Sequence, residues 1–454
     1  MNFDIAIIGG GPGGYNAAEK AAKLGMQVVL FEKEDLGGTC LNRGCMPTKA
    51  LIHSAEAYES MLHAESLGIK TGEVTYDFAA MHARKAQVVE ELRKGVEKLM
   101  KAGKIQVVYG QAQIAGPGVV TCGGETYEVK DIIIATGSKV AYPPIPGIRE
   151  EGVYNNRDIL EGEGKMFQSL IIIGGGVVGV ECASIYRALG CEVTVLEAAD
   201  HILPVMDKEI AQRLTMMLKK RGCKVEAKAM VQKIEGTPGN MTVTYLDKKG
   251  KETVVTAEGV LAAAGRCANV DGLFAEGVEI EMFKNAIVGD EVGRTSIPHI
   301  YVIGDAKAKN IQLAHVAEAQ GANAVAVIAG KEPPIDMSVV PSCVYTNPEI
   351  AAVGVTEDQA KAMGIMPKAV KFLTGANGKC LIENTDSGYV KLVTDSANGR
   401  ILGAQLVCPR ATDMIGELAL AVQKGITAEG LHAVIHPHPT FTEMISGAAA
   451  LAEG

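Results

Sequence analysis

The pattern of apolar and polar positions repeats itself within the chain. Residues 5–33 read IAIIGGGPGGYNAAEKAAKLGMQVVLFEK, and residues 170–198 read LIIIGGGVVGVECASIYRALGCEVTVLEA. The two segments align without a gap at an offset of 165 residues. Each has an apolar β-branched run, a Gly-rich turn, a helical stretch that stops at a glycine, and a second apolar run ending in glutamate. The pattern predicts two βαβ units.

The glycines of the two turns have the spacing of dinucleotide-binding units. In such turns one glycine makes the tight turn, one lets the backbone approach a pyrophosphate, and one lets helix and strand pack closely. The N-terminus of the following helix offers free N–H groups to the phosphates. Two purely structural βαβ units are the alternative. The glycines are Gly9, Gly11 and Gly14 in the first turn and Gly174, Gly176 and Gly179 in the second.

Each unit also ends in an acid placed to accept hydrogen bonds from a ribose. Glu32 and Glu197 each lie 18 residues past the last glycine of their turn. A carboxylate there binds the ribose hydroxyls. A 2′-phosphate near Glu197 would meet like charge, and no arginine lies in the following AADHILP. The second site is therefore expected to take NAD rather than NADP.

One long amphipathic stretch predicts a helix over residues 78–103. It places Val88, Leu92, Val96 and Leu99 at helical spacing. We interpret it as a packing helix with solvated charges. Turn-rich segments at 141–147 and 330–342 follow, and both indicate domain boundaries.

Composition narrows the class of protein. The chain has 454 residues, 47% of them hydrophobic, and a net charge of −9, which disfavours general nucleic-acid binding. No apolar run reaches the roughly 18 residues of a membrane span. No basic region or cleavage signal precedes the first strand, so we expect a cytoplasmic protein with reduced thiols. We expect the other eight cysteines to be buried and to act as small hydrophobic residues. They are Cys122, Cys182, Cys191, Cys223, Cys267, Cys343, Cys380 and Cys408.

Cys40 and Cys45, in GGTCLNRGCMPTKAL, are different because they lie close together. Zinc would need about four ligands, and no second cysteine pair lies nearby. An inert buried pair and a working dithiol remain. On a regular helix positions i and i+5 differ by about 140° in direction and about 7.5 Å in rise. A disulfide therefore needs a distorted turn, which Gly44 can supply, and a helix start with Lys49 would favour a thiolate.

The segment GGTCLNRGCMPTKAL resembles the redox-active segment of the flavin-dependent pyridine nucleotide–disulfide oxidoreductases. The resemblance covers essentially the whole chain and is closest to the members that oxidise dihydrolipoamide. It rests also on GGGPGGY (9–15), ATGS (135–138), GGGVVGVE (174–181), AAGR (263–266), VIGD (302–305), LAHVAEAQG (313–321), VYTNPEIAAVG (344–354) and HPHPTFTE (436–443).

The resemblance implies an α/β fold with two Rossmann-like dinucleotide-binding domains and a C-terminal α+β dimerisation domain. The expected boundaries are 1–143 and 269–334 for the two parts of the FAD-binding domain, 144–268 for the NAD-binding domain and 335–454 for the dimerisation domain. The residues implied for FAD are Gly9, Gly11, Gly14, Glu32, Lys49, Ala112, Thr136, Gly137, Asp305 and Ala314. Those implied for NAD are Gly174, Gly176, Gly179, Glu197, Val231 and Gly265, and Glu181 falls where the family has an acid near Lys49.

HPHPTFTE supplies a candidate base. The imidazole of His438 can take a thiol proton near neutral pH, and Glu443 is placed to fix its tautomer. The alternatives are a surface histidine braced by prolines, or a metal site with His432 and His436, for which no suitable ligand pattern exists. In the family such a pair acts on the disulfide of the other subunit, so the resemblance implies an obligate homodimer.

The implied reaction is the oxidation of protein-bound dihydrolipoyl groups through Cys40 and Cys45, with FAD as the bound cofactor and NAD+ as the hydride acceptor. The implied partners are a lipoyl-bearing E2 subunit of a 2-oxoacid dehydrogenase complex or the glycine cleavage H-protein; no nucleic acid, membrane or metal is expected. The alternatives are a glutathione reductase-like enzyme, a mercuric reductase and a non-enzymatic FAD scaffold. Cys267 follows Arg266 where relatives often have a second arginine.

Overall fold

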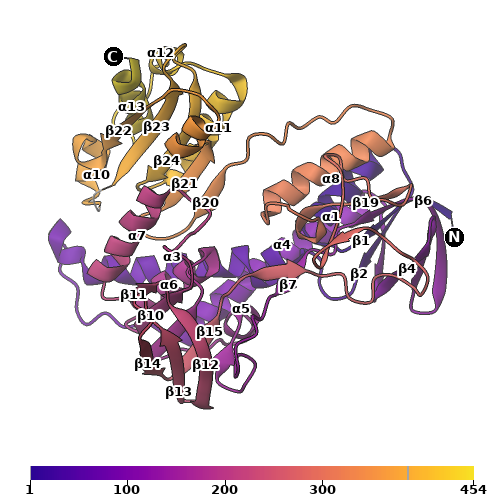
Figure 1. Ribbon diagram of the computed structural model, residues 1–454, viewed down its shortest axis with the longest axis horizontal. Coiled ribbons are helices and arrows are strands. Elements are labelled where there is room, and N and C mark those ends of the chain that lie inside the picture. The colour runs from indigo at the N-terminus through magenta and orange to yellow at the C-terminus, as the bar shows by residue number, and fades with distance from the viewer. Residues whose placement is uncertain (1, 386–387, 454) are drawn as a thin grey trace.

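The computed structural model describes residues 2–385 and 388–453, which form three parts (Figure 1). The first part is built on a sheet of order β3-β2-β1-β6-β5-β4, with β19 also paired to β6. Strands β1, β2, β3, β6 and β19 run parallel, and β4 and β5 extend the sheet as an antiparallel hairpin. The strands are β1 (Asn2–Ile8), β2 (Val28–Glu32), β3 (Gln106–Tyr109), β4 (Ala112–Gly116), β5 (Val119–Cys122), β6 (Glu125–Ile134) and β19 (Ile300–Val302).

Helices of the first part pack on this sheet and bring the two ends of its sequence together. Helix α1 packs against α8, although some 300 residues of chain separate them. The core between helices and sheet includes Ile5, Ile7, Leu30 and Ile133, all fully buried. The helices are α1 (Pro12–Lys23), α2 (Gly38–Arg43), α3 (Cys45–Leu62), α4 (Phe78–Ala102) and α8 (Ala314–Ile328).

The second part has a parallel sheet of order β11-β10-β9-β15-β8 and an antiparallel sheet of order β12-β13-β14. Its strands are β8 (Val153–Tyr154), β9 (Ser169–Ile173), β10 (Glu192–Glu197), β11 (Lys224–Ala227), β12 (Met230–Thr237), β13 (Asn240–Leu246), β14 (Glu252–Ala257) and β15 (Gly259–Ala262). Its helices are α5 (Asn156–Leu160), α6 (Val177–Ala188) and α7 (Lys208–Lys220). Strands β7 (Ser138–Val140) and β16 (Arg266–Ala268) pair where the chain enters and leaves this part.

The third part is an antiparallel sheet of order β20-β21-β24-β23-β22 covered by helices. An extended segment leads to it from α8 (Figure 1). Its strands are β20 (Ser342–Val344), β21 (Ile350–Gly354), β22 (Pro367–Leu373), β23 (Tyr389–Asp395) and β24 (Ile401–Val407). Its helices are α9 (Glu357–Ala362), α10 (Gly378–Ile382), α11 (Ala411–Lys424), α12 (Ala428–His432) and α13 (Glu443–Glu453). A short hairpin, β17 (Met282–Phe283) and β18 (Ala286–Ile287), precedes β19.

The two predicted βαβ units are confirmed. They are β1–α1–β2 and β9–α6–β10, and the strands of each pair are parallel. The mixed α/β fold with a separate C-terminal part agrees with the predicted class. The domain boundaries at 143, 268 and 334 remain predictions.

Two packing predictions are wrong in part. Leu92 is 41% exposed, whereas the buried face of α4 carries His82, Lys85 and Val89. Val96 is buried and Val88 and Leu99 are half-buried, so the predicted stripe is right in part. It missed the polar side chains at buried positions, which apolar periodicity does not reveal. Of the free cysteines, Cys267 and Cys343 are only half-buried, and the other six are buried as expected. No helix within the described ranges is long and apolar enough to cross a membrane.

Candidate active site

The two Gly-rich turns have the same geometry. Gly9 and Gly174 have φ angles of +107° and +106°, which disfavour any residue with a side chain. A Cβ on Gly14 would lie 1.8 Å from the carbonyl oxygen of Gly9, so helix and strand can approach only at a glycine. Gly179 would have the same conflict with Gly174, at 2.0 Å.

The middle glycines instead border open space. A Cβ on Gly11 would meet only the Cα of Gly38, at 3.8 Å, and one on Gly176 would meet nothing within 4 Å. Both lie immediately before the first residue of a helix, α1 or α6. Free N–H groups therefore face space at a helix N-terminus, which fits a bound pyrophosphate at each turn.

The two acids at the strand ends are bound to these turns. Glu32 accepts hydrogen bonds from the backbone N–H groups of Gly10 and Glu34, both at 2.8 Å. Glu197 does the same with Gly175, at 2.6 Å, and Ala199, at 2.7 Å. Burial raises the pKa of Glu32, and the Gly10 hydrogen bond opposes that rise. Each carboxylate oxygen retains a further lone pair for a ribose hydroxyl.

A pocket beside the first turn brings together four residues implied for FAD. Gly9, Glu32, Ala112 and Thr136 line it, although they come from four separate segments. The hydroxyl of Thr136 is buried and has no hydrogen-bond partner in the described part of the chain. A buried orphan hydroxyl is rare in a folded protein unless a ligand satisfies it. These residues therefore fit a polar cofactor such as FAD.

Asp305 is held beside the junction between the first two parts. It accepts a hydrogen bond from the hydroxyl of Ser138, at 2.5 Å. Arg266 in turn donates to Ser138 through Nε and through a terminal nitrogen to its carbonyl, both at 2.7 Å. Sequence reasoning assigned Asp305 but gave no role to Ser138 or Arg266, although they end the quoted segments ATGS and AAGR.

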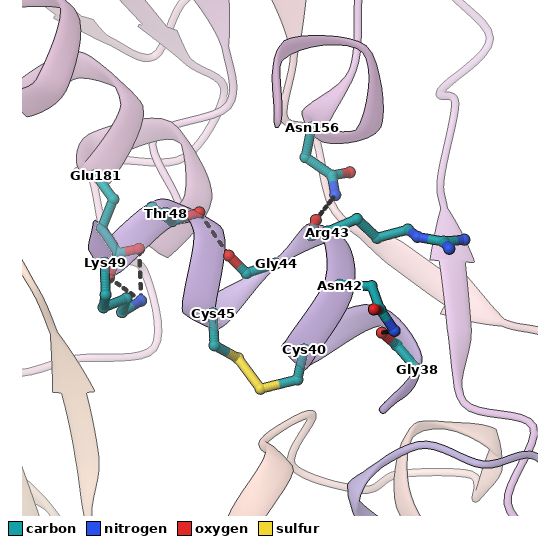
Figure 2. The surroundings of a disulfide bond; sticks show 10 residues. All are labelled: Gly38, Cys40, Asn42, Arg43, Gly44, Cys45, Thr48, Lys49, Asn156 and Glu181. Carbon is teal, nitrogen blue, oxygen red and sulfur yellow. Dashed lines mark hydrogen bonds and ion pairs between the residues drawn. A yellow bond between two sulfur atoms is a disulfide. The ribbon is translucent and has the colours of Figure 1, made fainter. Parts of the chain in front are cut away.

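Cys40 and Cys45 form a disulfide across the break between α2 and α3 (Figure 2). Their Cα atoms are 4.7 Å apart, closer than a continuous helix would allow. The break lies at Gly44, where a Cβ would crowd the Thr39 carbonyl oxygen at 3.0 Å. Cys45 is thereby the first residue of α3, at the end of the helix whose dipole favours a thiolate. The expected distortion at Gly44 is confirmed.

Lys49, one turn along α3, makes an ion pair with Glu181 of α6 (Figure 2). Its Nζ lies 2.8 and 3.0 Å from the two carboxylate oxygens. The ring centroid of Tyr345 lies 4.4 Å from the same Nζ, and the N–H of Tyr345 donates to Glu181 at 3.0 Å. All three parts of the fold thus meet here. The role of Tyr345 was missed, although it lies in the quoted segment VYTNPEIAAVG.

Arg43, between the cysteines, is a second link that the sequence did not reveal. Its guanidinium makes ion pairs with Glu34 and with Glu161, the latter at 3.2 Å. Its carbonyl oxygen accepts from Asn156 of α5, at 2.8 Å (Figure 2). These contacts tie the disulfide segment to the second part of the fold.

His438 and Glu443 form the expected pair. Nδ1 of His438 lies 2.8 Å from a carboxylate oxygen of Glu443, whose other oxygen accepts from the N–H of Thr440 at 2.8 Å. The Thr440 hydrogen bond, followed by that of His438, lowers the pKa of Glu443. A carboxylate can only accept, so Nδ1 carries a proton and Nε2 has the free lone pair of a base.

The dyad makes no polar contact with the disulfide of its own chain: among the described residues no hydrogen bond or ion pair joins His438 or Glu443 to Cys40 or Cys45. The His438 side chain is 80% exposed. In the described chain no group of three or more His, Cys, Asp or Glu residues could hold a metal.

For the remaining residues assigned to cofactor binding, the structure gives a position but no contact that tests the assignment. Gly137 and Gly265 have positive φ angles, +69° and +116°. Val231 lies in β12, and Ala314 is the first residue of α8.

Comparison with known proteins agrees with this geometry. Residues 3–321 match the pyridine nucleotide-disulphide oxidoreductase family, and residues 340–449 match the dimerisation domain of that family. A dihydrolipoyl dehydrogenase of Bacillus subtilis is 40% identical over 470 residues, covering all of this chain and 98% of its own. One from Geobacillus stearothermophilus is 40% identical over 464 residues, covering 100% and 97%.

Solved structures are similar over the same length. LpdA of Mycobacterium tuberculosis has a TM-score of 0.89 at 28% identity, with 99% of both chains covered. The HOCl-induced flavoprotein disulfide reductase RclA of Escherichia coli has a TM-score of 0.87 at 29% identity, again with 99% of each covered. With two nucleotide-type turns, a disulfide at a helix start and these full-length matches, the chain belongs to the pyridine nucleotide-disulphide oxidoreductase family.

Proposed function

We propose that this protein oxidises dihydrolipoyl groups to the cyclic disulfide, using FAD as the bound cofactor and NAD+ as the final acceptor. The observation that carries the proposal is the Cys40–Cys45 disulfide at the start of α3. The full-length similarity to dihydrolipoyl dehydrogenases supports this substrate.

The thiol chemistry begins at His438. Nε2 takes a proton from one thiol of the substrate, and Glu443 stabilises the resulting imidazolium through Nδ1–H. The substrate thiolate attacks Sγ of Cys40, a substrate–Cys40 disulfide forms, the Cys40–Cys45 bond breaks, and Cys45 leaves as a thiolate. The second substrate thiol loses its proton to water, and its thiolate displaces Cys40 and closes the substrate ring. The leaving Cys40 takes the proton held by His438. The substrate is thus oxidised and the cysteine pair reduced by two electrons.

The chain's other residues prepare this site. The helix dipole of α3 stabilises the Cys45 thiolate, and Lys49 adds a positive charge one turn away. Glu181 fixes the direction of that ammonium group. FAD held beside Gly9, Glu32 and Thr136 would supply the electron transfer between the dithiol and NAD+.

The dyad's partner disulfide belongs to the second subunit in this proposal. The 80% exposure of His438 supports it, since a base that must reach another chain has to face outward. The match of residues 340–449 to a dimerisation domain points the same way. The roles of His438, Glu443 and the nucleotide-site residues are all part of the proposal.

The lipoyl groups would be carried by partner proteins, such as an E2 subunit of a 2-oxoacid dehydrogenase complex or a glycine cleavage H-protein. We place the reaction in the cytoplasm, because the cysteines outside the active pair are free thiols, as expected in a reducing compartment.

The test compares two substrate pairs on the purified FAD-loaded protein. We expect dihydrolipoamide with NAD+ to be turned over much faster than glutathione disulfide with NADPH. The reverse order would assign a glutathione reductase-like enzyme instead. No turnover of either pair, with FAD bound, would indicate a non-enzymatic scaffold.

A further inference from the structure

His436 lies two residues before His438 but has a different environment. Its side chain is only 7% exposed, and both ring nitrogens have partners. Nδ1 lies 2.9 Å from the carbonyl oxygen of Val434, and Nε2 lies 3.0 Å from a carboxylate oxygen of Glu417 in α11. The ring therefore connects the loop to a helix of the C-terminal part.

Both partners of His436 are hydrogen-bond acceptors. A carbonyl oxygen and a carboxylate oxygen only accept, so each protonated ring nitrogen can donate to one of them. His436 thus has a partner at each ring nitrogen, whereas in the described part of the chain only Nδ1 of His438 has one.

The loop that carries His438 is held on both sides. Upstream, His436 ties it to α11. Downstream, Thr440 donates through its hydroxyl to the carbonyl of Pro437 at 2.7 Å and through its N–H to Glu443. His438 lies between these anchors and, at 80% exposure, has little packing of its own. The direction of its Nε2 therefore depends on how the loop is held.

We propose that His436 and Glu417 are positioning residues for the thiol-to-disulfide half of the reaction, fixing the backbone that aims Nε2 of His438 at its substrate. This inference rests on the proposed role of His438 as the base. It separates the two neighbouring histidines, since one moves a proton and the other holds the loop.

The two half-reactions distinguish positioning from general damage. Dihydrolipoamide reduces the enzyme with the help of His438, whereas NADH reduces it without that base. In His436→Gln and Glu417→Gln, we expect rapid-mixing measurements of flavin absorbance to show reduction by dihydrolipoamide slowed roughly 10- to 100-fold. Reduction by NADH should stay within about twofold of the parent. The control is His432→Gln, whose Nδ1 lies 3.2 Å from the hydroxyl of Ser446 on α13 and which should change neither rate.

A double-mutant comparison provides the decisive result. Residues that act through one group are not additive, so adding His436→Gln to His438→Gln should cost no further rate. A further loss of the same factor would overturn the proposal, as would equal slowing of both half-reactions. If His436→Gln disturbs the dimer, Glu417→Gln provides the same test, because it removes the charge that strengthens the hydrogen bond to Nε2. If His438→Gln itself leaves the dihydrolipoamide rate unchanged, the proposed base is wrong rather than the positioning pair alone.

Discussion

Lys49 and Glu181 form an ion pair whose two ends differ in burial. The Glu181 side chain is 4% exposed and that of Lys49 is 29% exposed. Removing the lysine therefore leaves a buried carboxylate without its counter-charge, which typically costs about 3–5 kcal/mol. Removing the acid leaves a cation that water can still reach.

We predict from this asymmetry that Lys49→Met destabilises the protein more than Glu181→Gln. The glutamine still offers an oxygen to the N–H of Tyr345. Thermal unfolding followed by circular dichroism measures the difference. The control is Lys130→Met, which removes an exposed pair with Asp4 and should change the unfolding midpoint little, because water screens exposed pairs. Equal destabilisation by the two active-site variants would contradict the explanation.

Cys40→Ser and Cys45→Ser should each reduce dihydrolipoamide oxidation about 1000-fold or more, because neither can re-form the disulfide. Both should keep bound FAD and still pass electrons from NADH to a small artificial acceptor. Steady-state assays with the two acceptors check this. Cys122→Ala, a buried free cysteine of β5, is the control and should retain both activities.

Mixed dimers test whether the dyad acts across subunits. A heterodimer of one Cys40→Ser subunit and one His438→Gln subunit has one intact site if the dyad acts on the partner, and none if it acts within its own chain. We predict about half of the parental activity for heterodimers purified through two different tags. Activity no greater than that of the two inactive homodimers would show that the dyad works within one chain.

Glu197→Gln should shift the nicotinamide preference toward NADP. Removing one like-charge contact with a 2′-phosphate, worth about 1–3 kcal/mol, should raise the ratio of kcat/KM for NADP to that for NAD roughly 10- to 100-fold. Glu192→Gln removes the same charge at the exposed start of the same strand and is the matched control. An equal change in both variants would indicate a general electrostatic effect.

His82 should make the protein less stable in mild acid. It is 1% exposed, and burial, with help from Lys85, lowers its pKa from 6.5 to about 4. Between those values the unfolded chain binds a proton that the folded chain does not, so stability falls as the pH falls from about 6.5 to 4, by up to about 3 kcal/mol. Above pH 6.5 both states are neutral and the effect vanishes.

The measurement for His82 is the midpoint of thermal unfolding between pH 4.5 and 7.5. His82→Phe keeps an aromatic ring beside Phe78 but cannot titrate, so its midpoint should fall less steeply with acid. Parallel curves for the two proteins would assign the acid sensitivity to other groups.

Local sequence was sufficient wherever function requires a fixed spacing of residue types. The turns at Gly9 and Gly174 follow from glycines whose positive φ angles disfavour other residues, and the break at Gly44 from a glycine where a Cβ would crowd the Thr39 carbonyl. Glu32 and Glu197 follow from their distance to those turns. Such features depend on the conformation of the backbone, which requires particular residue types at a fixed spacing in the sequence.

Contacts between segments that are distant in the sequence have no such fixed spacing and could not be predicted. The pairing of His436 with Glu417, of Ser138 with Asp305, and the burial of Lys85 depend on how the parts of the fold pack. Lys85 donates to the carbonyls of Leu160 and Gly162, so a charged side chain is buried at a position that apolar periodicity does not reveal. Such pairs cannot be identified from a single sequence before its fold is known.

The break at Gly44 also determines what happens after the disulfide opens. Thr48 donates to the carbonyl of Gly44 at 2.6 Å, and the Asn42 side chain donates to that of Gly38 at 3.0 Å; neither bond involves sulfur. The angle between α2 and α3 therefore persists in the dithiol, and the two thiols remain neighbours. Re-forming the bond is then an intramolecular event at high effective concentration, with no chain search to precede it. The bend of the backbone at Gly44 therefore keeps the sulfur atoms of Cys40 and Cys45 positioned to form the same disulfide in every turnover.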